Sequence, residues 1–91
     1  MQITFDPDKD AVNLKKHGLS LQFGTDILAE PNVLDLPDVR WDYGEDRWIA
    51  YGRVGARIYV CVYAEYADHS RIISVRKANE RETKRYQTEP R

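Results

Sequence analysis

The 91-residue sequence is poor in residues that bind metals or form disulfides: it has one cysteine, Cys61, and two histidines, His17 and His69. A single cysteine cannot form a disulfide within the chain, and the cysteine and histidines lack the paired spacing of a zinc site. Cys61 lies in an apolar run, which favours a buried structural thiol over a reactive one. We therefore expect no disulfide scaffold, no metal centre and no cofactor.

Long apolar runs and glycine-rich phosphate-binding loops are also missing. No stretch is long enough for a transmembrane helix, and the opening residues, MQITFDPDKD, lack the basic and apolar regions of a signal peptide. With 42% hydrophobic and 32% charged residues, the composition is that of a folded globular chain. We expect a single domain over residues 1–91, no membrane partner and a cytoplasmic location.

The small net charge of -1 hides an uneven distribution. Residues 1–70 carry 7 basic and 12 acidic side chains, while residues 71–86 carry 6 basic and 2 acidic ones. A basic segment on an acidic body can bind a polyanion locally, but it lacks a strong overall attraction for one. The alternative is that these charges pair within the chain or with a protein partner.

The predicted elements follow the order strand, two helices, three or four strands, and a final helix. Their ranges are 2–5 for the first strand, 7–17 and 21–30 for the helices, 33–36, 47–54, 57–66 and 71–78 for the later strands, and 80–87 for the last helix. Asp6 can cap the first helix, and Gly18 can end it in a left-handed conformation. Ser20 can cap the second, and Asn79 with Glu82 resembles a capping box for the third.

Alternation along the strands predicts which side chains share a face of the sheet. In the strand at 57–66, one face carries Ile58, Val60, Val62 and Ala64, and the other carries Tyr59, Cys61 and Tyr63. In the strand at 71–78, one face carries Ile73 and Val75, and the other carries Ile72, Ser74 and Arg76. Segregated elements of this kind predict an α+β domain, with helices packed on one face of a small antiparallel sheet.

Once metal sites and phosphate-binding loops are set aside, a group of acidic, basic and aromatic residues remains as candidates for chemistry. They are Lys16, His17, Glu45, Arg47, Arg71, Arg76 and Tyr86. These types suit RNA cleavage, because RNA carries its own nucleophile, the 2′-hydroxyl. A protein needs only a base, cations that stabilise the charged phosphorane, and an acid for the departing 5′-oxygen. By composition alone the signal is weak, since most small domains contain such a set.

Three blocks make the interpretation specific: FDPDKDAVNLKKHGLS at 5–20, YGEDRWIAYGRV at 43–54 and RIISVRKANERETKRY at 71–86. In this order they resemble the BrnT-type toxins of bacterial type II toxin–antitoxin systems, and the resemblance extends over nearly the whole chain. The resemblance implies a RelE-like ribonuclease fold, with two N-terminal helices and a C-terminal helix on a small antiparallel sheet. It also implies a toxin that cleaves RNA and inhibits translation.

The resemblance further implies a partner, a BrnA-type antitoxin whose ribbon-helix-helix domain binds the operon's own DNA. The toxin would then meet DNA only through the antitoxin. Direct DNA binding by the basic C-terminal helix is not favoured, because Glu80 and Glu82 interrupt its charge and no helix-turn-helix is apparent.

On this hypothesis, His17 or Glu45 is the base and Tyr86 or His17 is the acid. Arg47 and Arg76, together with Lys16, stabilise the phosphorane. The expected RNA-binding residues are Lys16, Arg71, Lys77 and Arg81.

Each of these residues also has a purely structural interpretation. His17 can simply stabilise the end of a helix dipole. Glu45 and Arg47, two apart on an extended segment, can form an ion pair. Arg71 can pair with Asp68 or Glu65, Glu82 can act as a cap, and Tyr86 can anchor the core. The alternative for the whole chain is a non-catalytic module that binds an antitoxin and modulates the regulation of their operon.

Overall fold

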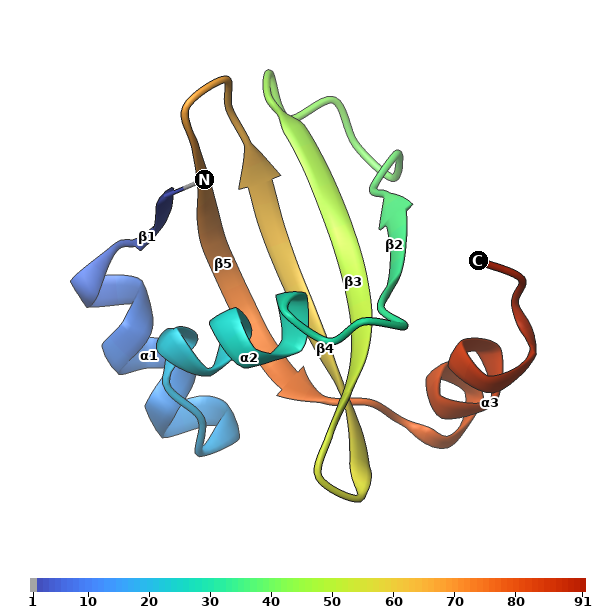
Figure 1. Ribbon diagram of the computed structural model, residues 1–91. Helices are drawn as coiled ribbons and strands as arrows, with labels where there is room; N and C mark the ends of the chain where they lie inside the picture. The colour runs from blue at the N-terminus through green and yellow to red at the C-terminus, as the bar shows by residue number, and fades with distance from the viewer. Residues whose placement is uncertain (1) are drawn as a thin grey trace.

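Among the described residues, 2–91, five strands form one mixed sheet with the order β1–β5–β4–β3–β2 (Figure 1). The chain is seen here in a computed structural model. The strands are β1 (Gln2–Phe5), β2 (Leu34–Pro37), β3 (Asp46–Val54), β4 (Arg57–Glu65) and β5 (His69–Lys77). The helical elements are α1 (Pro7–His17), the 3-10 turn η1 (Leu21–Phe23), α2 (Gly24–Leu28) and α3 (Glu80–Thr88). The expected α+β class is confirmed.

The ends of α1 and α3 confirm the capping signals in the sequence. The Asp6 side chain accepts a hydrogen bond from the Asp8 N–H, and Gly18 ends α1 in the left-handed conformation with φ 72. At α3, Asn79 and Glu82 form a reciprocal capping box. These local signals therefore define both helices to within one residue.

The second predicted helix is shorter and less regular than expected. Ser20 does cap it, but the chain first makes the 3-10 turn η1 and becomes α-helical only from Gly24. Gly24 lies deep in the core, where an added Cβ would come within 2.8 Å of Ile72. The close approach of this turn to the sheet explains why a glycine interrupts the helical sequence pattern.

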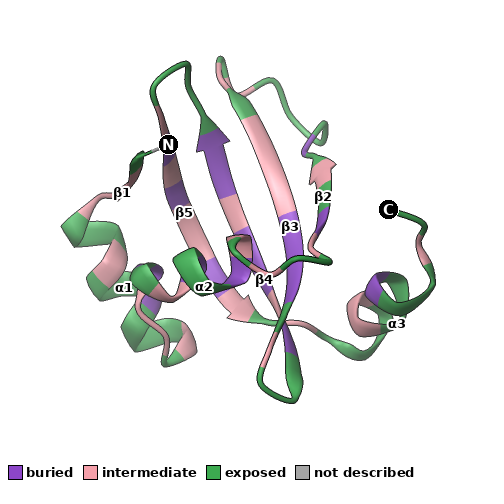
Figure 2. Ribbon diagram, in the orientation of Figure 1, coloured by how far each residue is buried: buried purple, intermediate pink, exposed green. Residues whose placement is uncertain are grey.

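The expectation of a purely antiparallel sheet with all helices on one face is wrong. β1 pairs in parallel with β5, although the other pairings are antiparallel. η1 and α2 pack on the face that carries Ala50 and Cys61, whereas α3 packs on the opposite face, over Tyr51 and Val60. The buried positions accordingly concentrate on the central strands (Figure 2), because α2 covers one face of the sheet and α3 covers part of the other.

α1 occupies a third position, at the edge of β5 beyond the end of β1 (Figure 1). The buried Asn13 joins it to the strand: its side chain bonds both the N–H and the C=O of Val75, and also the carbonyl of Leu19. A helix thus satisfies the backbone groups that a sixth strand would otherwise pair with.

The predicted faces of β4 are confirmed, but those of β5 are wrong at Ile72. A β-bulge lies between the pairs Val62–Ser74 and Tyr63–Ile72, so Ile73 has no partner on β4. The extra residue reverses the alternation, and Ile72 and Val75, three apart, are both fully buried in the same core. Arg76 keeps the face predicted for it.

Candidate active site

The face of the sheet that carries α3 is only partly covered. α3 covers one end of it by inserting Tyr86 among Leu34, Tyr51, Ile58 and Val60. Toward the other end, Arg47 on β3 and Arg71 on β5 lie opposite each other, with Ala64 of β4 between them in register. Because Ala64 is small and strands lie about 4.8 Å apart, both guanidinium groups can reach one site above it.

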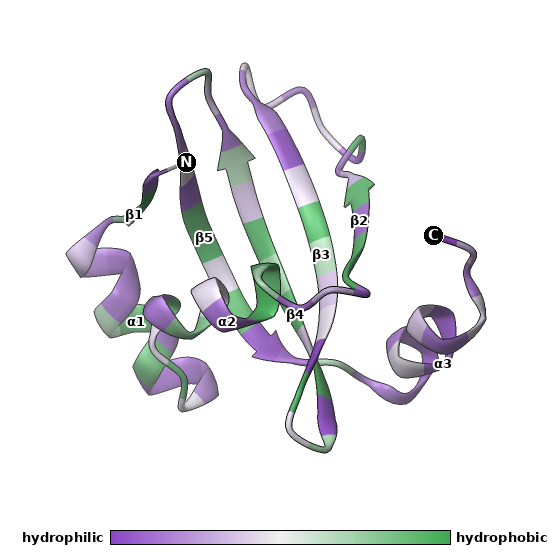
Figure 3. Ribbon diagram, viewed as in Figure 1, coloured by the Kyte–Doolittle hydropathy of each residue, from purple (hydrophilic) through white to green (hydrophobic). Residues whose placement is uncertain are grey.

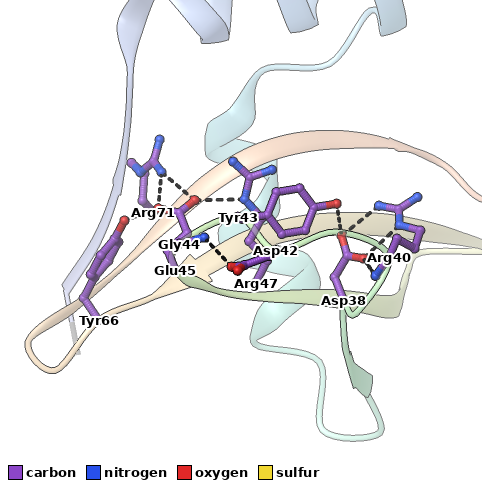
Figure 4. A network of polar contacts seen from close by, with 9 residues as sticks. All are labelled: Asp38, Arg40, Asp42, Tyr43, Gly44, Glu45, Arg47, Tyr66 and Arg71. Carbon is purple, nitrogen blue, oxygen red and sulfur yellow. Dashed lines mark hydrogen bonds and ion pairs between the residues drawn. The ribbon is translucent and has the colours of Figure 1, made fainter.

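That site is filled by the carboxylate of Glu45 (Figure 4). Arg47 Nε donates to Glu45 Oε2 at 2.8 Å, and Arg71 Nη2 bonds the two carboxylate oxygens at 3.0 and 3.1 Å. The Tyr66 hydroxyl also donates to Glu45. The hydrogen bonds from Tyr66 and then Arg47, together with the charge of Arg71, lower the pKa of Glu45 to about 2. The expected ion pair between Glu45 and Arg47 is therefore present, and Arg71 pairs with Glu45 rather than with Asp68 or Glu65.

A second carboxylate continues the polar network through the 38–45 loop (Figure 4). The Arg47 guanidinium lies 4.0 Å from the centre of the Tyr43 ring, and the Tyr43 hydroxyl donates to Asp38 at 3.2 Å. Asp38 is buried, and Arg40 holds both of its oxygens at 2.8 Å. These bonds from Arg40 lower the pKa of Asp38 to about 2. The loop is therefore fixed by the same type of charge pair as the strands.

Arg76 forms a separate pair with α3. Its two terminal nitrogens donate to the two oxygens of Glu82 at 2.8 Å each. The bond from Arg76 lowers the pKa of Glu82, which also bonds the Asn79 N–H as a helix cap. The pair lines a depression of about 380 Å³ that Arg40 and Arg85 also line.

The residues predicted from the sequence thus fall into separate groups rather than one constellation. Arg71 and Arg76 share a face of β5, but their partners on β4, Ala64 and Val60, are four residues apart, a distance of about 13 Å along the strand. They cannot contact the same phosphate oxygen. The 38–45 loop connects the two positions through Arg40 and Asp38, which border both groups.

His17 and Lys16 lie elsewhere, at the end of α1. Together with Ile73 and Ser74 at the β5 bulge they line a shallow hollow of about 330 Å³. Of the two, His17 is half-buried and Lys16 is exposed. No hydrogen bond joins this hollow to Glu45 among the contacts of the described residues. The hollow is therefore a second, lateral site. It is separate from the group formed by Glu45, Arg47, Tyr66 and Arg71, which we call the arginine cluster.

Tyr86 and the remaining basic residues lie around α3. Tyr86 is only 5% exposed, and its hydroxyl donates to Glu30, which fits the anchoring interpretation of this residue. Lys77 and Arg81 are exposed at the end of β5 and on α3. α3 itself is hydrophilic along most of its length (Figure 3), so Tyr86 is its main apolar contact with the sheet.

Sequence reasoning missed several members of the cluster, chiefly Tyr66 and His69. Both flank the tight turn between β4 and β5, and the Tyr66 N–H bonds the His69 carbonyl at 2.9 Å. Their rings stack with centroids 4.7 Å apart. Tyr66 ends the strand predicted at 57–66 and His69 lies between that strand and the next, and their distance in sequence from Glu45 concealed the contact. Arg40, Asp38 and Tyr43 were hidden in the same way within an irregular loop.

Comparison with known protein families identifies the type of protein. Residues 5–82 match the family described as the ribonuclease toxin BrnT of type II toxin–antitoxin systems. The chain belongs to the BrnT toxin family. The match includes Glu45, Arg47, Arg71 and Arg76 but ends before Tyr86. A search of curated proteins gives no match.

Membership of this BrnT family means that an antitoxin is the chain's partner. Within residues 2–91, no helix is long and apolar enough to cross a membrane. The same part of the chain has no group of three or more His, Cys, Asp or Glu side chains placed to hold a metal ion. Cys61 is buried, as its apolar surroundings in the sequence predict, and burial raises the pKa of its thiol to about 12.

Proposed function

We propose that the chain is a metal-independent endoribonuclease in which the 2′-hydroxyl of the RNA attacks the adjacent phosphorus. The observation that carries this proposal is the convergence of Arg47 and Arg71 on one site, now held by Glu45. A phosphate presents oxygens in the same forked arrangement as a carboxylate. Two preorganised guanidinium groups would stabilise the extra negative charge that phosphorus carries after attack.

In this proposal Glu45 is a positioning residue rather than the base. Its pKa near 2 means that the carboxylate binds a proton too weakly to remove one efficiently from a hydroxyl at neutral pH. Before RNA binds, its carboxylate instead holds both arginines at a fixed separation, and the Tyr66 hydroxyl bonds the same carboxylate. Of the two bases expected from the sequence, this leaves His17, which lies apart from the arginines in the lateral hollow.

The basic residues beyond the cluster would guide the RNA strand. Arg40 and Arg76 continue from the cluster toward α3, where Lys77 and Arg81 are exposed. Contacts of this kind fix the register of a nucleic acid without reading its sequence. Lys16 and His17, in the lateral hollow, would meet the RNA only if it also passes along α1.

The remaining partners follow from the resemblance of the chain to its family. We propose a BrnA-type antitoxin with a ribbon-helix-helix domain, and contact with DNA only through that antitoxin. RNA cleavage that stops translation would act in the cytoplasm, where ribosomes are. A RelE-like fold is part of the same proposal.

A second candidate, a non-catalytic antitoxin-binding module, is favoured by one observation. Arg47, Arg71 and Arg76 are already paired with carboxylates. An RNA phosphate must therefore share or displace these partners, which weakens binding to naked RNA. A protein partner could use the same face without displacing any charge.

Induced expression in bacteria separates the two candidates. The ribonuclease proposal predicts growth arrest and new RNA ends that carry a 5′-hydroxyl. Arg71→Ala should reduce both by roughly a hundredfold, the usual effect of removing one transition-state donor. Arg57→Ala, at an exposed arginine in the β3–β4 hairpin, is the matched control and should remain toxic. Equal toxicity of a folded Arg71→Ala variant would refute the assignment of the site, and a harmless wild-type chain would favour the binding module.

A further inference from the structure

The turn between β4 and β5 places an imidazole beside the arginine cluster. His69 and Arg71 are two residues apart on β5, so their side chains leave the same face about 7 Å apart. Tyr66 fills the space next to them: its ring stacks on His69 and its hydroxyl donates to Glu45. The imidazole is thus one aromatic ring away from the carboxylate that holds both arginines.

The hydrogen bond made by the His69 imidazole determines which of its two nitrogens can accept a proton. His69 Nδ1 lies 2.7 Å from Oδ1 of Asp68. A carboxylate can only accept, so in the neutral imidazole the proton is on Nδ1 and the lone pair on Nε2 is free. The hydrogen bond from His69 also lowers the pKa of Asp68, which keeps that carboxylate an acceptor. The neutral His69 is therefore oriented to accept a proton at Nε2.

We propose that His69 is the general base of the ribonuclease reaction, an inference that rests on the proposed function. Nε2 removes the proton of the 2′-hydroxyl as that oxygen forms its bond to phosphorus. The bond between phosphorus and the 5′-oxygen then breaks, and its electron pair leaves with the oxygen. A water molecule transfers the proton from the imidazolium to the departing 5′-oxygen. The products are a 2′,3′-cyclic phosphate and a 5′-hydroxyl, and His69 returns to its neutral form.

The spacing fits a nucleotide bound across the cluster. With a phosphate on Arg47 and Arg71, the 2′-hydroxyl of the ribose whose 3′-oxygen is bonded to that phosphorus lies within a few ångströms of it. The separation of about 7 Å between His69 and Arg71 leaves room for one hydrogen bond at each end of that unit. His17 does not meet this requirement, because it belongs to the lateral hollow beside the β5 bulge.

The charged and titratable groups around His69 must be considered in any pH profile. They include Asp68 and Tyr66 in the turn, Arg71 on the same strand, and Glu45 behind Tyr66. Asp46 and Glu65, at facing ends of β3 and β4, line a hollow with Glu45 and Tyr66. The neighbouring β1 contributes the neutral Gln2 as register partner. A base that must be neutral gives a rate that falls on the acidic side of the profile.

The test is the pH dependence of kcat/KM for cleavage of a short single-stranded RNA, supplied with ribosomes if free RNA is not cleaved. Wild type should lose activity with a slope of one on the acidic side. His69→Gln should lower the rate roughly 10²- to 10⁴-fold and abolish that slope. In His69→Ala, added imidazole should restore part of the activity. Asp68→Asn should reduce the rate, whereas Asp26→Asn, at an exposed carboxylate in α2, should match wild type.

The outcomes separate this inference from the proposed function. If wild type cleaves, and the acidic slope persists in a folded His69→Gln variant but vanishes in His17→Gln, then His69 is not the base. A folded His69→Ala variant that imidazole cannot rescue, while it retains wild-type RNA binding, would also overturn the assignment. If wild type cleaves no RNA with or without ribosomes, the proposed function itself fails. Circular dichroism and thermal unfolding of each variant exclude loss of fold as the cause.

Discussion

Asn13 in α1 pairs with Val75 in β5 as a neighbouring strand would. Its Oδ1 accepts the Val75 N–H at 3.2 Å, and its Nδ2 donates to the Val75 carbonyl at 2.9 Å. A second bond from Nδ2 reaches the carbonyl of Leu19 at 2.8 Å. One carboxamide thus ties the helix, the loop after it and the edge of the sheet together.

Replacing Asn13 by Ala should therefore be costly. It leaves the N–H and C=O of Val75 without partners in a buried position, and we expect a loss of roughly 2–4 kcal/mol in the free energy of unfolding. Asn13→Asp should be worse at neutral pH, because a carboxylate would face two carbonyl oxygens. Chemical denaturation measures both, with Asn32→Ala at an exposed position as control. A loss no larger than that of the control would show that α1 does not depend on this residue.

Gly52 allows α2 to approach β3 closely. A Cβ at this position would lie 2.7 Å from the backbone oxygen of Ile27, which cannot rotate away. Gly52→Ala should cost about 1–3 kcal/mol, the usual range for overpacking. Gly24→Ala is the matched comparison, because there the nearest atom is the mobile end of the Ile72 side chain. Thermal unfolding should rank Gly52→Ala as the less stable variant, and the reverse order would contradict this packing argument.

Glu45 should make stability depend on acidity. Since its pKa is lowered to about 2 in the folded protein, its contribution is complete above the unfolded pKa, near 4.3, and is lost as pH falls toward 2. Glu45→Gln should be less stable than wild type by roughly 1–3 kcal/mol at pH 7. The difference should shrink between pH 5 and pH 2 in urea titrations. A difference that does not change with pH would mean that Glu45 owes its effect to packing alone.

Glu82 is expected to restrain Arg76. Glu82→Gln keeps a side chain that can complete the capping box but removes the charge that holds the guanidinium. Binding of a 2′-O-methyl RNA, which cannot be cleaved, should become tighter. Its dependence on salt should steepen by about one phosphate contact.

Glu80→Gln is the control for this experiment, because it removes the same charge from the first turn of α3 without touching Arg76. Fluorescence anisotropy at several salt concentrations gives both quantities. If the two variants bind RNA equally, release of Arg76 is not the cause of any gain.

Much of the fold could be predicted because its signals are local. Asp6, Gly18 and Asn79 mark helix ends through hydrogen bonds within a few residues of themselves. Likewise the alternation in β4 predicts correctly which side chains reach each core. Family resemblance adds the type of protein, which neither composition nor periodicity could give.

The parts that failed depend on contacts between distant segments. Nothing near Ile73 in the sequence marks it as the extra residue of a bulge, and nothing in 2–5 shows that this strand runs parallel to β5. The candidate site could not be predicted for the same reason, since Arg71 and Glu45, which form an ion pair, are 26 residues apart in the sequence. Tyr66 and His69 were missed because neither the end of a predicted strand nor the segment after it reveals what lies across from it.

Cleavage of an end-labelled single-stranded RNA by the purified chain in EDTA tests the central claim most directly. One parallel reaction adds ribosomes, in magnesium buffer. Two others replace the wild-type chain by the Arg71→Ala or the Arg76→Ala variant. A fourth replaces the substrate by an RNA with 2′-deoxy nucleotides at the cleaved positions. The account predicts cleavage by wild type that leaves 2′,3′-cyclic phosphate ends. It also predicts strong loss with Arg71→Ala and resistance of the deoxy substrate. Cleavage of the deoxy substrate, or no cleavage by folded wild type with or without ribosomes, would contradict it.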